Sequence, residues 1–186
     1  MTLNARVRPR LERARRRVPS WLARTCGVLA LATLLAACGQ TSYTAAEHLE
    51  RARGFSAQND PVSAIIEVKN ALQQEPEDAE ARWLLGVLHL EVMDGATAYA
   101  ELRRAADLGI APERVRVPLM RAALLIGNAQ EVLDASADLD DMPEAQAVEA
   151  LALRAQALLM RGEIAAAREV LLDATRRDAT QRDVLY

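Results

Sequence analysis

Apolar residues recur three and four positions apart from Thr44 to the end of the chain, the spacing of one helix face. Short polar turns interrupt the pattern. In one of them Asp60 can cap a helix that begins at Pro61. Thr44 and Glu47 have the spacing of a capping box, which marks the first helix start. We expect helices over residues 44–57, 61–74, 79–92, 96–108, 112–126, 129–138, 143–161 and 163–177.

These helices are joined by short turns, so they predict four helical hairpins. Gly109, Gly127 and Gly162 stand where helix ends favour a residue in the left-handed conformation. The hairpins recur at a period of about 34 residues, which is typical of helical repeats. A single hairpin cannot bury its apolar face, so we expect the hairpins to stack into an all-α superhelix. The expected array covers residues 44–180, with repeats near 45–78, 79–112, 113–147 and 148–181.

Small side chains occur where the two helices of a hairpin must approach closely. Larger apolar residues recur at other fixed positions of the repeat. The residues at all these recurring positions are Ala52, Phe55, Ala64, Val68, Ala71 and Pro76 in the first repeat, Leu85, Gly86, Ala98, Leu102 and Ala105 in the second, and Ala155, Leu158, Ala167, Leu171 and Ala174 in the fourth. The chain therefore resembles the tetratricopeptide repeat superfamily. The third repeat departs from the pattern, with Val132 and Ser136 at two of these positions. An ordinary four-helix bundle or another solenoid is the competing interpretation.

The first 37 residues have the features of an export signal. They contain eight arginines and one acid, Glu12, and end in an uncharged run over 27–37. That run is too short to span a bilayer, which takes about 20 residues, but it fits the apolar part of a signal peptide. The run leads into residues that resemble the bacterial lipobox: Leu35, Ala36, Ala37 and Cys38. The resemblance implies cleavage after residue 37 and lipid attachment at Cys38, with residues 38–43 as a lipidated tether. A plain secretory peptide with an incidental cysteine is the alternative.

Charge separates the leader from the body of the protein. The whole chain has a net charge of −3, but beyond residue 37 it carries 15 basic and 25 acidic residues. An acidic body lacks the clustered positive charge that nucleic acids require, so we expect no nucleic-acid partner. The second cysteine, Cys26, lies in the leader, so we expect no disulfide in the mature protein.

Three stretches carry a closer resemblance: residues 63–73, 78–86 and 100–105. They are similar to the amino-terminal repeats of the PrsT-type lipoproteins, the tetratricopeptide-repeat proteins of the PEP-CTERM/exosortase system. This resemblance implies a lipid-anchored scaffold in the cell envelope. Gly39 and Gln40 after the lipid site include no aspartate, which by resemblance to known lipoproteins favours the periplasmic face of the outer membrane. Members of that family usually have many further repeats, whereas this sequence stops at Tyr186. We therefore expect Leu171 and Leu172 to lack a following neighbour, unless a partner or a tail covers them.

Residues for catalysis or metal binding are sparse. His48 and His89 are the only histidines, and neither has the spaced partners of a zinc site. We interpret the acidic residues Asp138, Asp140 and Asp141 as part of a solvated turn, because a calcium loop needs more alternating oxygen ligands and a central glycine. The sequence contains no nucleophile–base–acid pattern and no phosphate-binding loop. We expect no enzyme activity, no cofactor and no metal.

Binding is the remaining function. The tetratricopeptide resemblance implies that the first helix of each hairpin lines a concave groove for peptides or partner helices. The residues that map to this groove are Leu49, Arg53, Glu80, Trp83, Val87, Glu91, Arg114, Arg121, Glu149 and Gln156. Trp83 is the expected apolar anchor, because tryptophan is enriched at interface hot spots. Packing between repeats is the alternative role for Trp83.

Four functions fit these features. The first is a membrane-anchored scaffold for exopolysaccharide or PEP-CTERM protein export. The second is a lipoprotein that assists pilus or outer-membrane protein assembly. The third is the anchoring module of an enzyme, and the fourth is a truncated remnant without function.

Overall fold

The computed structural model describes residues 43–184, with side chains as far as residue 178. The described residues form eight helices and no strand, as expected for an all-α fold. The helices are α2 (Ala45–Ala57), α3 (Pro61–Gln74), α4 (Ala79–Glu91), α5 (Gly95–Asp107), α6 (Pro112–Leu125), α7 (Ala129–Ala135), α8 (Glu144–Met160) and α9 (Ile164–Val184). The signal peptide and the lipobox lie outside the described residues.

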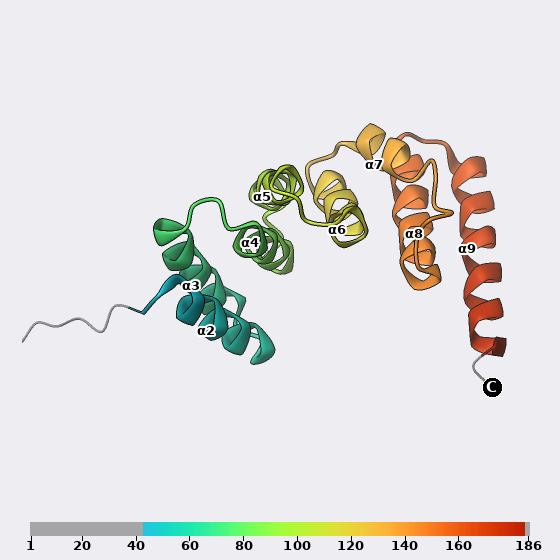
Figure 1. Cartoon of the computed structure of the whole chain (residues 1–186). Helices are drawn as coiled ribbons and strands as arrows, with labels where there is room; N and C mark the ends of the chain where they lie inside the picture. The colour runs from blue at the N-terminus through green and yellow to red at the C-terminus, as the bar shows by residue number, and fades with distance from the viewer. Residues whose placement is uncertain (1–42, 185–186) are drawn as a thin grey trace, which may run out of the picture. The chain divides into compact units, whose positions relative to one another are not determined.

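Consecutive helices pack as hairpins, which follow one another in chain order in Figure 1. The pairs are α2 with α3, α4 with α5, α6 with α7, and α8 with α9. The second helix of each hairpin also contacts the first helix of the next one. In addition α6 contacts both α4 and α8, so the first helices of the last three hairpins lie next to each other. This arrangement confirms the predicted stack of four hairpins.

The helix ends follow the predicted turn chemistry. Thr44 and Glu47 form the complete capping box at the start of α2. The Asp60 carboxylate accepts a hydrogen bond from the backbone N–H of Ser63, and Pro61 is the first residue of α3. The predicted left-handed glycine is present after α5, where Gly109 has φ 99°. Local sequence therefore determines where most of the helices begin and end.

Small residues let the paired helices approach closely. Ala64 and Ala98 are completely buried at matching positions of the first two hairpins. At Gly86 a Cβ atom would lie 2.6 Å from Cγ of Leu102, well inside van der Waals contact. Leu102 is itself completely buried, so it has little room to move. Glycine at position 86 is therefore a packing requirement of the second hairpin.

The third hairpin is irregular, as its departure from the repeat pattern predicts. Met120 and Val132, both completely buried, stand where the other hairpins have alanine or glycine. Helix α7 was expected over 129–138 but ends at Ala135. Beyond that point the Ser136 hydroxyl donates to the Val132 carbonyl oxygen at 2.7 Å, a local bond that competes with helix continuation. The chain then turns and buries Leu139 against the core.

Candidate functional site

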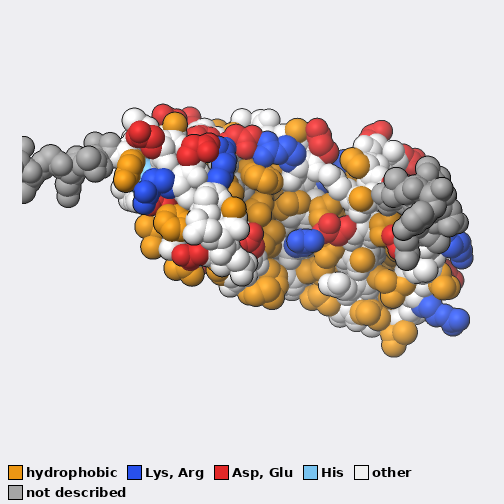
Figure 2. Space-filling model, turned by 90° about the horizontal axis from the view of Figure 1, so that it is seen from below, with side chains coloured by type: hydrophobic (Ala, Val, Ile, Leu, Met, Phe, Trp, Pro, Cys, Tyr) orange, Lys and Arg blue, Asp and Glu red, His pale blue; other side chains and the backbone are white. Residues whose placement is uncertain are grey.

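An apolar pocket lies between the first helices of the last three hairpins. Its volume is about 580 Å³. The residues that line it are Val87, Leu90 and Glu91 of α4, Met93 in the turn after α4, Pro118, Arg121, Leu124 and Leu125 of α6, and Leu153, Gln156 and Met160 of α8. We call this site the α4–α6–α8 pocket. Figure 2 shows hydrophobic side chains spread over much of one face of the molecule, with charged side chains gathered along one edge.

Four residues predicted for a groove line this pocket: Val87, Glu91, Arg121 and Gln156. Nη2 of Arg121 lies 2.5 Å from Oε1 of Glu149, so a fifth predicted residue pairs with the arginine. This ion pair joins α6 to α8. Both side chains are substantially exposed, so the pair orients charge more than it stabilises the fold. The pocket thus combines apolar walls with a few charged groups, the usual make-up of a binding site. A binding role for these five residues stays a prediction.

Glu80, Trp83 and Arg114 form a separate unit that links the second and third hairpins. The Arg114 guanidinium donates two hydrogen bonds to the Glu80 carboxylate, one of them at 2.9 Å. The same guanidinium lies 4.3 Å from the centre of the Trp83 ring, and Trp83 Nε1 donates to the Arg114 carbonyl oxygen at 3.2 Å. Trp83 also packs against buried residues of α5 and α6. These contacts fit the alternative role of Trp83, which is packing between repeats. A role for Trp83 as an anchor for a partner protein stays a prediction.

Glu80 and Arg114 each stabilise the charged form of the other. Hydrogen bonding to Arg114 lowers the pKa of the Glu80 carboxyl, more than its partial burial raises it. The same hydrogen bonding raises the pKa of Arg114. Both groups are therefore charged at neutral pH. Their bidentate geometry joins α4 to α6 with a defined orientation.

The predicted groove residues of the first hairpin lie away from the pocket lining. Arg53 is exposed and pairs with Glu50 on its own helix. Leu49 is buried in the core between α2, α3 and α4. The structure therefore brings together groove residues of the last three hairpins in the pocket, and those of the first hairpin do not line it. After the hydrogen bonding to Arg114, the charge of Arg53 nevertheless also helps to lower the pKa of the Glu80 carboxyl.

Sequence reasoning missed the exposed apolar residues of the pocket. Met93, Leu125 and Met160 line it with exposed fractions of 70%, 40% and 53%. Each stands at or just past the C-terminal end of a first helix, within two residues of the turn to the second helix. The usable signal was an apolar residue placed beside a helix-ending turn, where a polar residue is the more common choice. That signal recurs in three hairpins.

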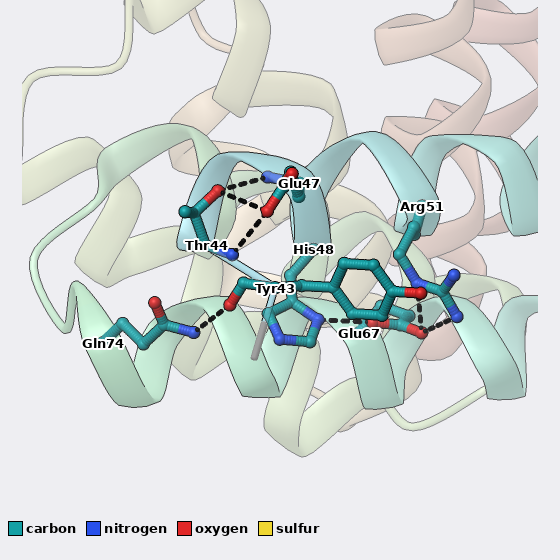
Figure 3. A network of polar contacts seen from close by, with 7 residues as sticks. All are labelled: Tyr43, Thr44, Glu47, His48, Arg51, Glu67 and Gln74. Atoms are coloured by element: carbon teal, nitrogen blue, oxygen red, sulfur yellow. Dashed lines mark hydrogen bonds and ion pairs between the residues drawn. The ribbon is translucent and has the colours of Figure 1, made fainter. Parts of the chain in front are cut away.

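A polar network ties the start of the described chain to the first hairpin, as Figure 3 shows. Nδ1 of His48 lies 2.5 Å from Oε2 of Glu67, and Arg51 Nε donates to Oε1 of Glu67 at 2.9 Å. Hydrogen bonding to Arg51 is the largest cause of the lowered pKa of Glu67. The Arg51 guanidinium also lies 4.5 Å from the centre of the Tyr43 ring. With both carboxylate oxygens engaged, this network is a structural clamp.

The backbone of Tyr43 is held as well. Gln74 Nε2, at the end of α3, donates to the Tyr43 carbonyl oxygen at 2.9 Å. The point where the chain enters the fold is therefore fixed to α3, although Tyr43 itself precedes the first described helix.

The part of the chain that the structure describes contains no candidate metal cluster and no candidate membrane-spanning helix. In that part of the chain no group of three or more His, Cys, Asp or Glu residues could hold a metal ion. His89 is buried, with Nδ1 3.1 Å from Oδ2 of Asp94. The described helices include none with the length and apolar character needed to cross a bilayer.

Comparison with known proteins identifies the fold. Neither a protein-family model nor a curated protein matches the sequence. A crystal structure of MamA, a TPR-like helical-repeat protein, superposes with a TM-score of 0.66 at 18% identity, over 87% of this chain and 95% of that chain. At this identity the likeness concerns the fold alone, and the resemblance to PrsT-type lipoproteins stays a prediction. The chain therefore has a tetratricopeptide-type helical-repeat fold.

Proposed function

We propose that this chain is a membrane-anchored scaffold that binds other proteins through the α4–α6–α8 pocket. It acts in the export of exopolysaccharide or of PEP-CTERM proteins, and it works by binding and not by catalysis. The pocket is the observation that supports this function. The export system and the anchor rest on the sequence resemblances.

The chemistry of the pocket suits a helical peptide of a partner protein. Its exposed apolar residues, Met93, Leu125 and Met160, come from three successive hairpins. Methionine and leucine side chains adapt to different apolar shapes, and an amphipathic helix presents its own apolar residues three and four positions apart. Glu91 and Arg121 offer charges of both signs beside these apolar walls. We therefore propose a partner helix with one apolar face and mixed charge on either side of it.

The anchor would keep the scaffold close to the membrane. With lipid attached at Cys38, the tether over residues 38–43 runs from the acyl chains to Tyr43, the first residue that the structure describes. A fully extended stretch of that length spans about 20 Å, so the first hairpin stays near the lipid surface. Several acyl chains on one residue give stable attachment. The proposed site is the periplasmic face of the outer membrane.

The test compares two variants that change exposed residues only. The pocket variant carries Met93→Glu, Leu125→Glu and Met160→Glu. The matched control carries Val62→Glu and Ile66→Glu, which are 62% and 56% exposed on α3, outside the pocket. Each full chain is expressed in its own host, extracted in mild detergent and purified, and the bound proteins are identified by mass spectrometry.

We expect the unchanged chain and the control to retain the same export-system partner and the pocket variant to lose it. A partner from a pilus or outer-membrane assembly system, lost in the same way, would keep the scaffold and replace the export assignment. Equal retention of every bound protein by both variants would contradict binding through the pocket.

A further inference from the structure

The outer face of α9 is an apolar surface separate from the α4–α6–α8 pocket. Ile164, Leu171 and Leu172 are 70%, 45% and 48% exposed. The residues Leu159, Ile164, Ala167, Arg168, Leu171, Leu172 and Thr175 line a depression of about 320 Å³. We call this surface the α9 face. Apart from Leu159, which lies near the end of α8, its residues recur every three or four positions along α9, so they form a continuous stripe on one side of the helix.

Part of this stripe is buried in the first two hairpins: the places of Ala167 and Leu171 are buried there, whereas that of Leu172 is held by the exposed residues Lys69 and Arg103. Leu171 occupies the place in the fourth hairpin that Val68 occupies in the first and Leu102 in the second. Val68 and Leu102 have no exposed surface. Val68 packs in a core that includes Leu85 of α4, and Leu102 packs with Ala122 of α6. In both cases the first helix of the next hairpin forms part of the cover. The α9 face therefore continues a series of established interfaces.

The opposite end of the stack is built differently. Helix α4 contributes Ala81, Leu85 and Leu88 to its interface with the hairpin before it. The same three positions of α2 hold Glu47, Arg51 and Gly54. Charged residues and glycine at this end give a polar surface, which is how helical-repeat stacks are kept soluble. A second copy of the chain therefore offers no apolar first-helix face for head-to-tail packing on α9.

We propose that the α9 face binds a helical hairpin of the same repeat type, supplied by a partner protein. The first helix of that hairpin carries small or aliphatic side chains at three positions spaced four and then three apart, as Ala81, Leu85 and Leu88 are in α4. It also carries an acidic residue opposite Arg168. Among the described residues Arg168 has no hydrogen-bond or ion-pair partner, and it lies within the apolar stripe. A carboxylate from the partner would neutralise this charge when the face is covered.

The test supplies such a hairpin to the full chain. A copy of residues 79–111 is joined after Tyr186 through a flexible glycine–serine linker. Hydrogen exchange then measures the protection of the α9 amides over residues 164–175. The control fusion carries Leu→Glu substitutions in the added hairpin, at its copies of Leu85 and Leu88. A further pair of chains carries Leu171→Glu, with and without the added hairpin.

We expect the added hairpin to slow exchange in α9 by about tenfold or more, because covered segments open less often. The control fusion and the fusion with Leu171→Glu should exchange like the unextended chain. Leu171→Glu alone should leave exchange in the unextended chain unchanged, since the side chain is already half exposed. Equal protection by the hairpin and its control would overturn the proposal.

Light scattering on the unextended chain separates this proposal from self-association. We expect a monomer at tens of micromolar. A dimer that Leu171→Glu dissociates would mean that the α9 face is covered by a second copy, and it would overturn the partner hairpin. Neither measurement involves the pocket residues, so this proposal and the proposed function can fail separately.

Discussion

The side chain of Leu102 in α5 packs closely against Gly86 in α4. A β-carbon added to residue 86 would lie 2.6 Å from Cγ and 2.9 Å from Cδ2 of Leu102. The backbone nitrogen of Leu102 would be 3.2 Å away, so a change of rotamer cannot relieve the whole clash. The contact joins the two helices of the second hairpin, next to the pocket-lining residues of α4. It therefore offers a direct test of the repeat packing.

Gly86→Ala should destabilise the protein. Overpacking costs about 1–3 kcal/mol, and the gain in helix propensity returns about 1 kcal/mol, so we expect a net loss of up to about 2 kcal/mol. Urea unfolding followed by circular dichroism measures the change. The matched control is Gly54→Ala in α2, where nothing lies within 4 Å of the added Cβ. That control should stabilise the protein by about 0.5–1 kcal/mol, and a stabilised Gly86→Ala variant would show that the two helices are not so closely packed.

Glu67→Gln should weaken the clamp on the first hairpin. It removes the charge that accepts hydrogen bonds from Arg51 and contacts His48, at a cost of about 1–3 kcal/mol at neutral pH. Since folding lowers the pKa of Glu67, its contribution is complete above the pKa of the unfolded chain, near the ordinary 4.5, and is lost as pH falls through the lower folded-state pKa.

The difference in unfolding free energy between the wild type and Glu67→Gln should therefore shrink as the pH is lowered from 7 to 3. Chemical unfolding at a series of pH values measures it. Glu77→Gln is the control, because Glu77 is exposed and pairs only at the surface with Arg104. A pH-independent difference for Glu67→Gln would contradict the assigned ion pair.

Arg114→Ala should expose the face of the Trp83 ring. Trp83 is the only tryptophan after residue 21, so the fluorescence of a chain that begins at Tyr43 reports on this ring alone. We expect a red shift of its emission and a loss of about 1–2 kcal/mol in stability, from the cation–π contact and the bidentate pair with Glu80. Arg53→Ala, which removes an exposed arginine outside this unit, should leave the emission unchanged. An unshifted spectrum in Arg114→Ala would mean that the guanidinium does not cover the ring.

Cys38→Ser should release the protein from the membrane. Without the thiol no thioether to lipid can form, so labelled palmitate should not be incorporated and the chain should leave the membrane fraction. Fractionation and palmitate labelling in the native host measure both effects. Cys26→Ser is the control, because Cys26 lies in the expected leader and should be removed with it. Unchanged labelling of Cys38→Ser would exclude the predicted lipid anchor.

Local chemistry made the fold predictable from the sequence. Helix starts at Thr44 and Pro61 follow from hydrogen bonds and backbone geometry within a few residues, and alanines such as Ala64 and Ala98 mark the close approach of paired helices. The end of α7 was less predictable, because it depends on a bond made by Ser136 and on the burial of a residue beyond the helix.

The candidate site was predictable only in part. The resemblance placed Val87, Glu91, Arg121 and Gln156 on first helices, and all four line the pocket. The position of Trp83 under Arg114 depends on how the second and third hairpins pack, which the repeat pattern does not specify. The exposure of Met160 has the same origin, because an apolar residue near a helix end can be buried or exposed according to its neighbours.

The most direct test of the proposed scaffold is photo-crosslinking in living cells from position 156. A photoreactive amino acid replaces Gln156, which is exposed and lines the pocket, and in a matched strain it replaces Lys69, which is exposed on α3 outside the pocket. We expect a discrete crosslinked protein from position 156, absent from position 69 and lost when Met93→Glu, Leu125→Glu and Met160→Glu are added. The same crosslinked proteins from both positions, or none from position 156, would contradict a scaffold that binds its partner through the α4–α6–α8 pocket.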